Sequence, residues 1–195
     1  MSKYYDLLAP AERSGFRRKQ IALMRLKEGE KVLDAGCGTG SLSILAKLAV
    51  GDAGQVCGID IAPRMIAQAE KKAGKYRLDI DFRAASIADL PFPDERFDAV
   101  ISSLVFHHLP VHIKKEALEE VYRVLKSDGR FILADFCTPG FISAPLMFIF
   151  LIWLNSTRSQ LFGKLPALIR ESGFKSIKLA EKGFFLKYYL IEKRI

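Results

Sequence analysis

Three glycines at alternate positions, Gly36, Gly38 and Gly40, constrain the fold of this chain more than any other feature. They follow an apolar run over residues 31–34 and precede a helical pattern over residues 41–50. Glycine keeps one face of such a strand-to-helix turn free of side chains and permits positive φ angles. The helix that follows would direct unpaired backbone N–H groups and the positive end of its dipole at the loop. The segment therefore predicts a site for a small anion or for the tail of a nucleotide cofactor.

An acidic residue at the end of the next apolar run supports a nucleotide. Asp60 closes the predicted strand over residues 55–60, twenty positions after Gly40. A carboxylate at this place can accept two hydrogen bonds from the vicinal hydroxyls of a ribose. The glycine loop and Asp60 together predict a site in which backbone groups hold one end of the ligand and the carboxylate holds its sugar.

Two kinds of nucleotide cofactor fit such a site. A dinucleotide fingerprint, G-x-G-x-x-G, requires its third glycine at position 41, where this chain has Ser41. Asp34 also lies beside the place where a pyrophosphate would bind, and two negative charges repel there. A carboxylate suits a cationic amino group better. The pattern therefore disfavours an NAD(P)-dependent oxidoreductase, which stays the alternative enzyme.

With these features in place, the sequence resembles the class I S-adenosylmethionine-dependent methyltransferases, especially small members related to quinone-biosynthesis and phospholipid N-methyltransferases. Five segments carry the resemblance in the family's order and spacing: residues 32–40, 58–65, 88–100, 106–109 and 123–129. The resemblance implies an enzyme that binds S-adenosylmethionine and transfers its methyl group to a small acceptor by in-line displacement, leaving S-adenosylhomocysteine. The non-enzymatic alternative is a protein that binds the cofactor, has lost transfer activity and works by interaction.

The resemblance also assigns roles to single residues. The glycine loop with Cys37 would hold the methionine part of the cofactor, and Asp34 would lie near its ammonium group. Asp60 would bind the ribose hydroxyls. Ile61 and Met65 would flank the adenine, although Met65 fits an ordinary helical core stripe equally well. The set is completed by three residues near later strands: Ser86, where many relatives have an acidic residue, Ile87 and Ser102.

Two adjacent histidines, His107 and His108, are the catalytic candidates. They follow the fourth predicted strand, at the carboxyl edge where ligands bind in such sheets. An imidazole there can take a proton from a hydroxyl or an amine near neutral pH. The alternative is that one histidine bonds to backbone and the other is solvated. We expect no metal site, because the three cysteines have neither zinc-ligand spacing nor the pattern of a disulfide framework.

Short apolar runs alternate with helical stripes along the chain, which predicts an α/β fold. The expected architecture is a doubly wound, mostly parallel seven-stranded sheet, Rossmann-like, with a C-terminal antiparallel hairpin. The expected strands cover residues 31–34, 55–60, 80–84, 97–102, 130–135, 176–180 and 184–191. The expected helices cover residues 10–26, 41–50 and 113–125, with another that begins at residue 63 and a stop at residues 126–129.

We expect residues 1–195 to form a single methyltransferase domain. Within it, residues 1–29 would supply an N-terminal helix and a lid over the cofactor, and residues 137–172 a substrate-side insertion. The start of the chain lacks the layout of a signal peptide, so the expected location is cytoplasmic.

Charge and one apolar stretch bear on the acceptor and the partners. The net charge of +8 favours anionic partners, although a basic face without function is the more common case. Residues 141–154 are nearly all apolar but are too few to span a bilayer. They could line a pocket for a hydrophobic small-molecule substrate, form a homodimer surface, contact a membrane peripherally, or be buried in the core. Nothing indicates a nucleic-acid partner.

Overall fold

The computed structural model describes residues 10–136, 165–182 and 186–193. The expected lid before residue 10, most of the expected insertion, and the apolar stretch 141–154 lie outside the described residues. In the part of the chain that is described, no helix is both long enough and apolar enough to cross a membrane.

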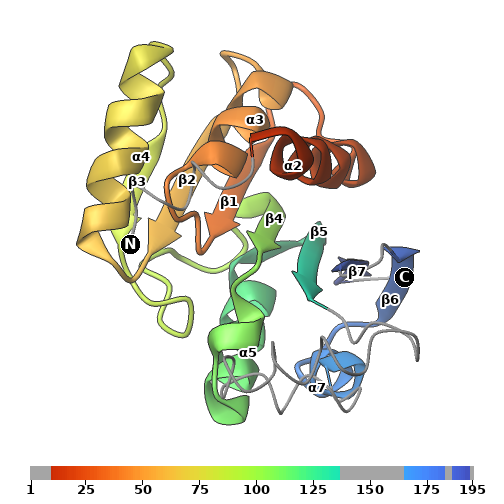
Figure 1. Ribbon diagram of the computed structural model, residues 1–195. Helices are drawn as coiled ribbons and strands as arrows, with labels where there is room; N and C mark the ends of the chain where they lie inside the picture. The colour runs from red at the N-terminus through yellow and green to blue at the C-terminus, as the bar shows by residue number, and fades with distance from the viewer. Residues whose placement is uncertain (1–9, 137–164, 183–185, 194–195) are drawn as a thin grey trace, which may run out of the picture.

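A seven-stranded sheet in the order β3-β2-β1-β4-β5-β7-β6 forms the centre of the molecule (Figure 1). Strands β1 to β5 pair in parallel, and β7 is antiparallel to both of its neighbours, β5 and β6. The strands are β1 (Lys31–Ala35), β2 (Gln55–Asp60), β3 (Asp81–Ala84), β4 (Phe97–Ser103), β5 (Leu125–Phe136), β6 (Ser176–Lys182) and β7 (Leu186–Glu192). The expected mostly parallel sheet with a C-terminal antiparallel hairpin is confirmed.

Helices cover both faces of this sheet (Figure 1). They are α2 (Pro10–Met24), α3 (Ser41–Val50), α4 (Pro63–Lys75), α5 (Val111–Val124) and α7 (Leu165–Glu171), with a short 3-10 helix, η1 (Phe106–His108). Adjacent residues of one strand pack on opposite faces, because side chains alternate along a strand. In β1, Val32 packs with α2 and α3, whereas Leu33 packs with α5 and α7. Central strands buried on both faces explain the continuous apolar runs of the sequence.

The start of β5 differs from the expectation of a stop at residues 126–129. Leu125 already pairs with Phe97, and the next pairs join Arg130 to Ala99, so four residues of β5 bulge opposite Asp98. Lys126 Nζ lies 2.5 Å from Asp98 Oδ1 across this bulge. A bulge breaks the alternation of side chains that marks a strand. Residues 126–129 therefore look like a turn in the sequence.

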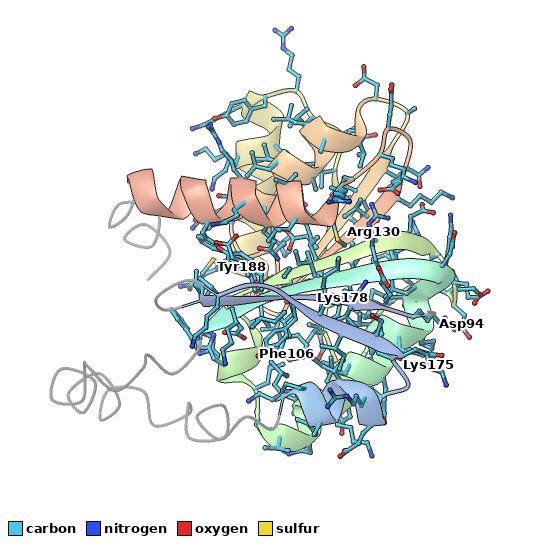
Figure 2. The ribbon with its side chains drawn as sticks, turned by 90° about the vertical axis from the view of Figure 1, so that its right-hand side faces the viewer. Asp94, Phe106, Arg130, Lys175, Lys178 and Tyr188 are labelled. Atoms are coloured by element: carbon cyan, nitrogen blue, oxygen red, sulfur yellow. The ribbon has the colours of Figure 1, made fainter. Side chains whose placement is uncertain are left out.

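Arg130 joins the sheet to the end of the opening helix. Its Nε donates to the carbonyl oxygen of Met24 at 2.8 Å, and its Nη2 lies 2.7 Å from a carboxylate oxygen of Glu30. Figure 2 shows Arg130 near the end of this helix. The contact anchors α2, which forms part of the wall of the cavity described below.

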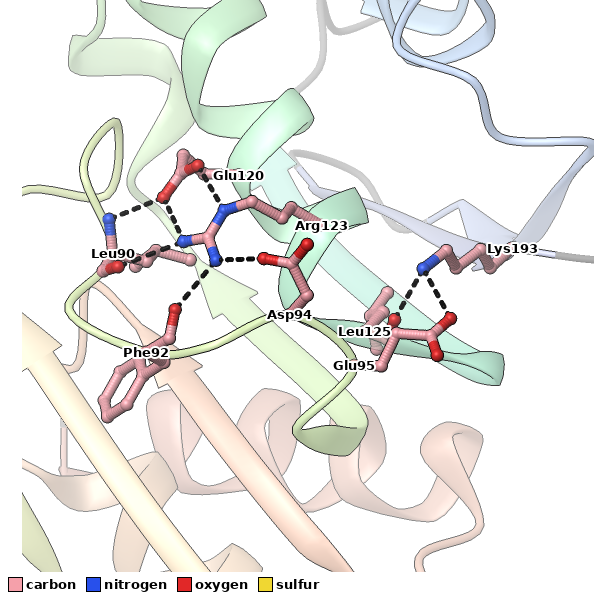
Figure 3. A network of polar contacts seen from close by, with 8 residues as sticks. All are labelled: Leu90, Phe92, Asp94, Glu95, Glu120, Arg123, Leu125 and Lys193. Carbon is pink, nitrogen blue, oxygen red and sulfur yellow. Dashed lines mark hydrogen bonds and ion pairs between the residues drawn. The ribbon is translucent and has the colours of Figure 1, made fainter.

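Arg123 on α5 fixes the loop that precedes β4 (Figure 3). Its guanidinium donates to the carbonyl oxygens of Leu90 and Phe92 at 3.1 and 2.8 Å. It also pairs with the carboxylates of Glu120 at 2.7 Å and Asp94 at 2.8 Å. The planar fork of arginine can serve all these acceptors at once. The network holds the loop that begins at Ser86, where the cavity wall lies.

Candidate functional site

A cavity of about 520 Å³ opens at the carboxyl ends of β1, β2 and β4. Asp34, Asp60 and Ser103 reach it from these three strands, and the glycine loop forms part of its wall. The strand order switches direction between β1 and β4, because β2 and β3 lie on one side of β1, and β4 and β5 lie on the other. Ligands of open α/β sheets bind at such a point. The cavity therefore lies where the sequence predicts the ligand.

The three glycines of the loop have positive φ angles but serve different purposes. At Gly38 an added Cβ would meet nothing within 4 Å, so this residue leaves room in the cavity. At Gly36 an added Cβ would lie 2.2 Å from Val105 Cγ2. At Gly40 it would lie 2.8 Å from Ala69 Cβ. Gly40 does not line the cavity, and its close packing against α4 explains the glycine.

Asp60 is held at the cavity by two backbone donors. Its Oδ2 accepts from the backbone N–H of Gly38 and its Oδ1 from that of Ala62, both at 2.9 Å. A carboxylate has about four acceptor positions, so each oxygen can still accept from a ligand hydroxyl. Ile61 and Met65 line the cavity next to Asp60, and Ile61 is 77% exposed.

Asp34 lines the cavity and is 1% exposed. Ser43 Oγ donates to its Oδ2 at 2.5 Å. Burial raises the pKa of Asp34 to about 7, although Ser43 and the positive charge of Arg17 oppose the rise. A cation bound beside Asp34 would favour the ionised carboxylate.

Ser86 and Ile87, which the sequence places near the cofactor, line the cavity. The Ser86 hydroxyl accepts from the backbone N–H of Ala88 at 3.1 Å, which fixes the turn after β3. A hydroxyl that accepts in this way keeps its hydrogen for another acceptor.

The two histidines lie in different environments. His107 is 3% exposed and does not line the cavity; its Nδ1 is 2.8 Å from Asp135 Oδ1. His108 lines the cavity, and its ring centroid lies 3.8 Å from that of His107. Burial lowers the pKa of His108, as does the charge of His107, and Asp135 opposes both. Of the two catalytic candidates, only His108 borders the cavity.

The serine at the end of β4 that borders the cavity is not the one expected. Ser102 is fully buried and donates from Oγ to the carbonyl oxygen of Ala35 at 2.7 Å, so its side chain joins β4 to β1. β4 extends one residue beyond the predicted end, and Ser103 lines the cavity. Among the described residues, Ser103 Oγ is buried and has no hydrogen-bond partner.

Sequence reasoning missed several residues of the cavity wall. Phe16 and Arg17 come from α2, far from the glycine loop in sequence. The others are apolar and surround η1: Leu104, Val105, Leu109 and Ile113. The sequence did predict the helix that carries Phe16 and Arg17. It could not show that the Arg17 side chain points to the cavity, because a single arginine in a basic helix does not reveal its direction.

Comparison with known proteins supplies independent findings. A family model described as a methyltransferase domain matches residues 32–129. Demethylmenaquinone methyltransferase of Thermus thermophilus is 37% identical over 139 residues, which are 69% of this chain and 62% of that protein. Demethylmenaquinone methyltransferase of Lactobacillus johnsonii is 32% identical over 67% of this chain and 55% of that protein. Arsenite methyltransferase of Halobacterium salinarum is 32% identical over 83% of this chain. The chain spans 41% to 62% of the length of these relatives.

Solved structures share the fold. A methyltransferase from Aquifex aeolicus described as SAM-dependent matches with a TM-score of 0.71 at 22% identity, over 90% of this chain and 88% of that one. A geranyl diphosphate C-methyltransferase from Streptomyces coelicolor, solved with S-adenosylhomocysteine, matches with a TM-score of 0.73 at 16% identity, over 92% of this chain and 78% of that one.

Proposed function

This chain belongs to the class I S-adenosylmethionine-dependent methyltransferases, whose cofactor is S-adenosylmethionine, and we propose that it transfers a methyl group to a small lipophilic acceptor by in-line displacement. When bound, the cofactor supplies a methyl group made electrophilic by the attached sulfonium. The chain would supply binding, orientation and exclusion of water, which such a displacement needs more than a covalent catalyst.

The residues around the cavity fit this cofactor. Gly38 leaves space beside the loop, and Asp34 would face a cationic ammonium group. Asp60 would accept from the ribose hydroxyls, and Ile61 with Met65 would cover an adenine. The buried hydroxyl of Ser103 has no partner among the described residues, which suits a polar group of the bound ligand.

The acceptor side of the cavity carries the proposal of a lipophilic substrate. Leu104, Val105, Leu109 and Ile113 make this wall apolar, and His108 is the imidazole within it. An apolar wall favours an apolar acceptor, because burial of both surfaces is favourable. Since the lowered pKa of His108 keeps it neutral near pH 7, it can accept a proton from an ionisable group of that acceptor.

A quinol has both properties, an apolar body and a weakly acidic hydroxyl, and two of the relatives are named for demethylmenaquinone. Arsenite, the substrate named for another relative, would favour accessible thiolates. The cysteines in the described part of the chain, Cys37 and Cys57, are both buried, and burial raises the pKa of Cys57 to about 11. We therefore place a quinol-like acceptor ahead of arsenite.

The wider organisation belongs to the same proposal. Residues 1–195 would form one methyltransferase domain, with a lid at its start and an acceptor-side insertion in residues 137–172. Residues 141–154 would line the acceptor pocket, form a homodimer surface or contact a membrane peripherally.

Radiolabelled S-adenosylmethionine tests the proposal directly. The chain is incubated with reduced demethylmenaquinone, with its oxidised form, with a phospholipid extract and with arsenite, and label in each product is counted. We expect transfer to the quinol, and much less to the oxidised quinone, which has no hydroxyl proton to give. Asp60→Ala serves as a control, because its weakened cofactor binding should lower the transfer of label. Tight binding of S-adenosylhomocysteine without transfer to any acceptor would favour the alternative of an inactive cofactor-binding protein.

A further inference from the structure

Asp135, at the end of β5, is a buried carboxylate that holds the histidine pair. Its Oδ1 accepts from Nδ1 of His107 at 2.8 Å and from the backbone N–H of Phe136 at 2.7 Å. Its Oδ2 accepts from the backbone N–H of His107 at 2.9 Å. Asp135 is 2% exposed. A buried carboxylate must be compensated by such donors, so the geometry requires the proton of His107 on Nδ1.

The His107 ring is held between two other rings. Phe136 meets it edge-on, with centroids 4.8 Å apart and planes at 74°. The His108 ring lies 3.8 Å away, with the planes at 43°. One hydrogen bond and two ring contacts therefore fix His107 in place, and His107 in turn supports the ring that borders the cavity.

From this arrangement we propose that Asp135 and His107 form a buried positioning dyad for His108, which takes the proton of the methyl acceptor. The inference rests on the proposed function. In the step that it describes, a ring nitrogen of His108 gains the proton, the acceptor keeps the electron pair of the broken bond, and the proton later leaves to water from the exposed His108 side chain. His107 touches neither the cavity nor the acceptor, so it is a positioning residue.

The charges around His108 give the dyad an electrostatic effect as well. The negative charge of Asp135 raises the pKa of His108, whereas the positive charge of His107 lowers it by more, and burial lowers it most. Burial lowers the pKa of Lys114 of α5, which is 2% exposed, and Asp135 opposes this change. Arg17, Asp34 and Asp60 line other parts of the same cavity. Burial and the neighbouring His107 together outweigh Asp135, so the pKa of His108 is lowered and its neutral ring can accept a proton.

Titration of the histidines by NMR tests this inference without any acceptor. The chain has three histidines, and His112 is exposed, so it is an internal control. In Asp135→Asn, a neutral amide no longer compensates a positive charge on His107, so the dyad predicts that both charges of the pair disappear together. We expect the His108 midpoint to rise towards 6.5 but to stay below it, because burial remains.

A second variant keeps the test valid if Asp135→Asn does not fold. In His107→Asn, the amide can still donate to Asp135, and the positive charge is gone while the carboxylate remains. The His108 midpoint should then rise further than in Asp135→Asn, so the expected order is wild type, Asp135→Asn, His107→Asn. The His112 midpoint should be equal in all three proteins. An identical His108 midpoint in all three, or the highest midpoint in the wild type, overturns the dyad and leaves Asp135 with a structural role.

The pH profile of methyl transfer gives the second readout. In Asp135→Asn, the acidic limb of kcat should move to higher pH with the His108 midpoint, with a loss of at most about twofold at pH 6.5 and a larger loss at lower pH, whereas KM for the cofactor should not change. A uniform loss of kcat at every pH contradicts the dyad. Binding of S-adenosylhomocysteine is measured alongside. Failure of the wild type to bind it counts against the proposed function, whereas the midpoints alone decide the dyad.

Discussion

Asp60 and Gly38 are joined by a hydrogen bond in which the backbone N–H of Gly38 donates to the Asp60 carboxylate at 2.9 Å. The contact connects the end of β2 with the glycine loop after β1. It orients the carboxylate in advance of any ligand, so a ribose would not have to order this side chain on binding.

Replacement of Asp60 should therefore weaken binding of the cofactor, and alanine should weaken it more than asparagine. Asp60→Ala removes the acceptor for the loop and for the ribose, and we expect the binding free energy to fall by about 1.5–3 kcal/mol, as for charge-assisted hydrogen bonds. Asp60→Asn keeps one neutral acceptor and should lose less. Calorimetry with S-adenosylhomocysteine measures both. Unchanged affinity in a folded Asp60→Ala protein contradicts the ribose assignment.

Asp34 should make binding of the cofactor depend on pH. Its pKa is raised to about 7, so below pH 7 the carboxyl group is mostly neutral, whereas a bound ammonium group needs it ionised. We expect the affinity for S-adenosylmethionine to rise about tenfold per pH unit from pH 5 to 7 and to level off above 7. Asp34→Asn should bind weakly with little dependence on pH in this range. Equal slopes in the two proteins would show that another group is responsible.

The carboxyl group of Asp34 should also make the stability of the fold depend on pH. A rise in pH should lower this stability, whereas it should strengthen binding of the cofactor. In the unfolded chain Asp34 ionises near 3.8, whereas in the fold it holds its proton up to about pH 7. The folded state binds more protons in this window, so the contribution of Asp34 falls as pH rises from 3.8 to 7, by about 4 kcal/mol in total. Urea unfolding of wild type and Asp34→Asn at pH 5 and pH 8 measures it. Relative to wild type, Asp34→Asn should be more stable at pH 8 than at pH 5. A gain in stability at pH 5 alone would contradict the predicted direction.

Arg123 should be hard to replace even by another cation. Lysine keeps the charge but cannot serve Glu120, Asp94 and two carbonyl oxygens at once, so Arg123→Lys should lower the free energy of unfolding by about 1–3 kcal/mol. Arg64→Lys, on the exposed side of α4, is the matched control and should change stability by less than about 0.5 kcal/mol. Denaturant unfolding of both variants gives the comparison. Similar losses in both would mean that the network around Arg123 adds little.

Leu104, on the cavity wall, has a φ angle of +58°, which is unfavourable for a residue with a Cβ. An alanine variant is usually more stable than the glycine variant at the same position. At position 104 the order should be reversed, with Leu104→Gly more stable than Leu104→Ala by about 1 kcal/mol. At Leu109, where φ is −83°, the alanine variant should be the more stable one. Thermal unfolding of the four variants checks the pair of differences. Alanine ahead of glycine at both positions would remove the claim of strain.

Much of the fold could be predicted because its signals are local. Glycine spacing located the loop, apolar runs located the strands, and Asp60 followed from its place at a strand end. The bulge at the start of β5 could not be predicted, because it depends on pairing with β4. The roles of Ser102 and Ser103 could not be separated either, since a shift of one residue exchanges the faces of a strand.

The histidine pair shows the same limit. Adjacent in sequence, His107 and His108 differ because Asp135, 28 residues away, binds one of them. Arg17 escaped prediction for a similar reason, because only the packing of α2 brings it to the cavity.

Calorimetry with S-adenosylhomocysteine and with NAD tests the central claim, that the cavity of the glycine loop and Asp60 binds an adenosyl sulfonium cofactor. We predict a single site for S-adenosylhomocysteine with a dissociation constant on the order of micromolar, equivalent to about −8 kcal/mol, and no measurable binding of NAD. A folded protein that ignores S-adenosylhomocysteine at millimolar concentration, or that binds NAD instead, contradicts the account.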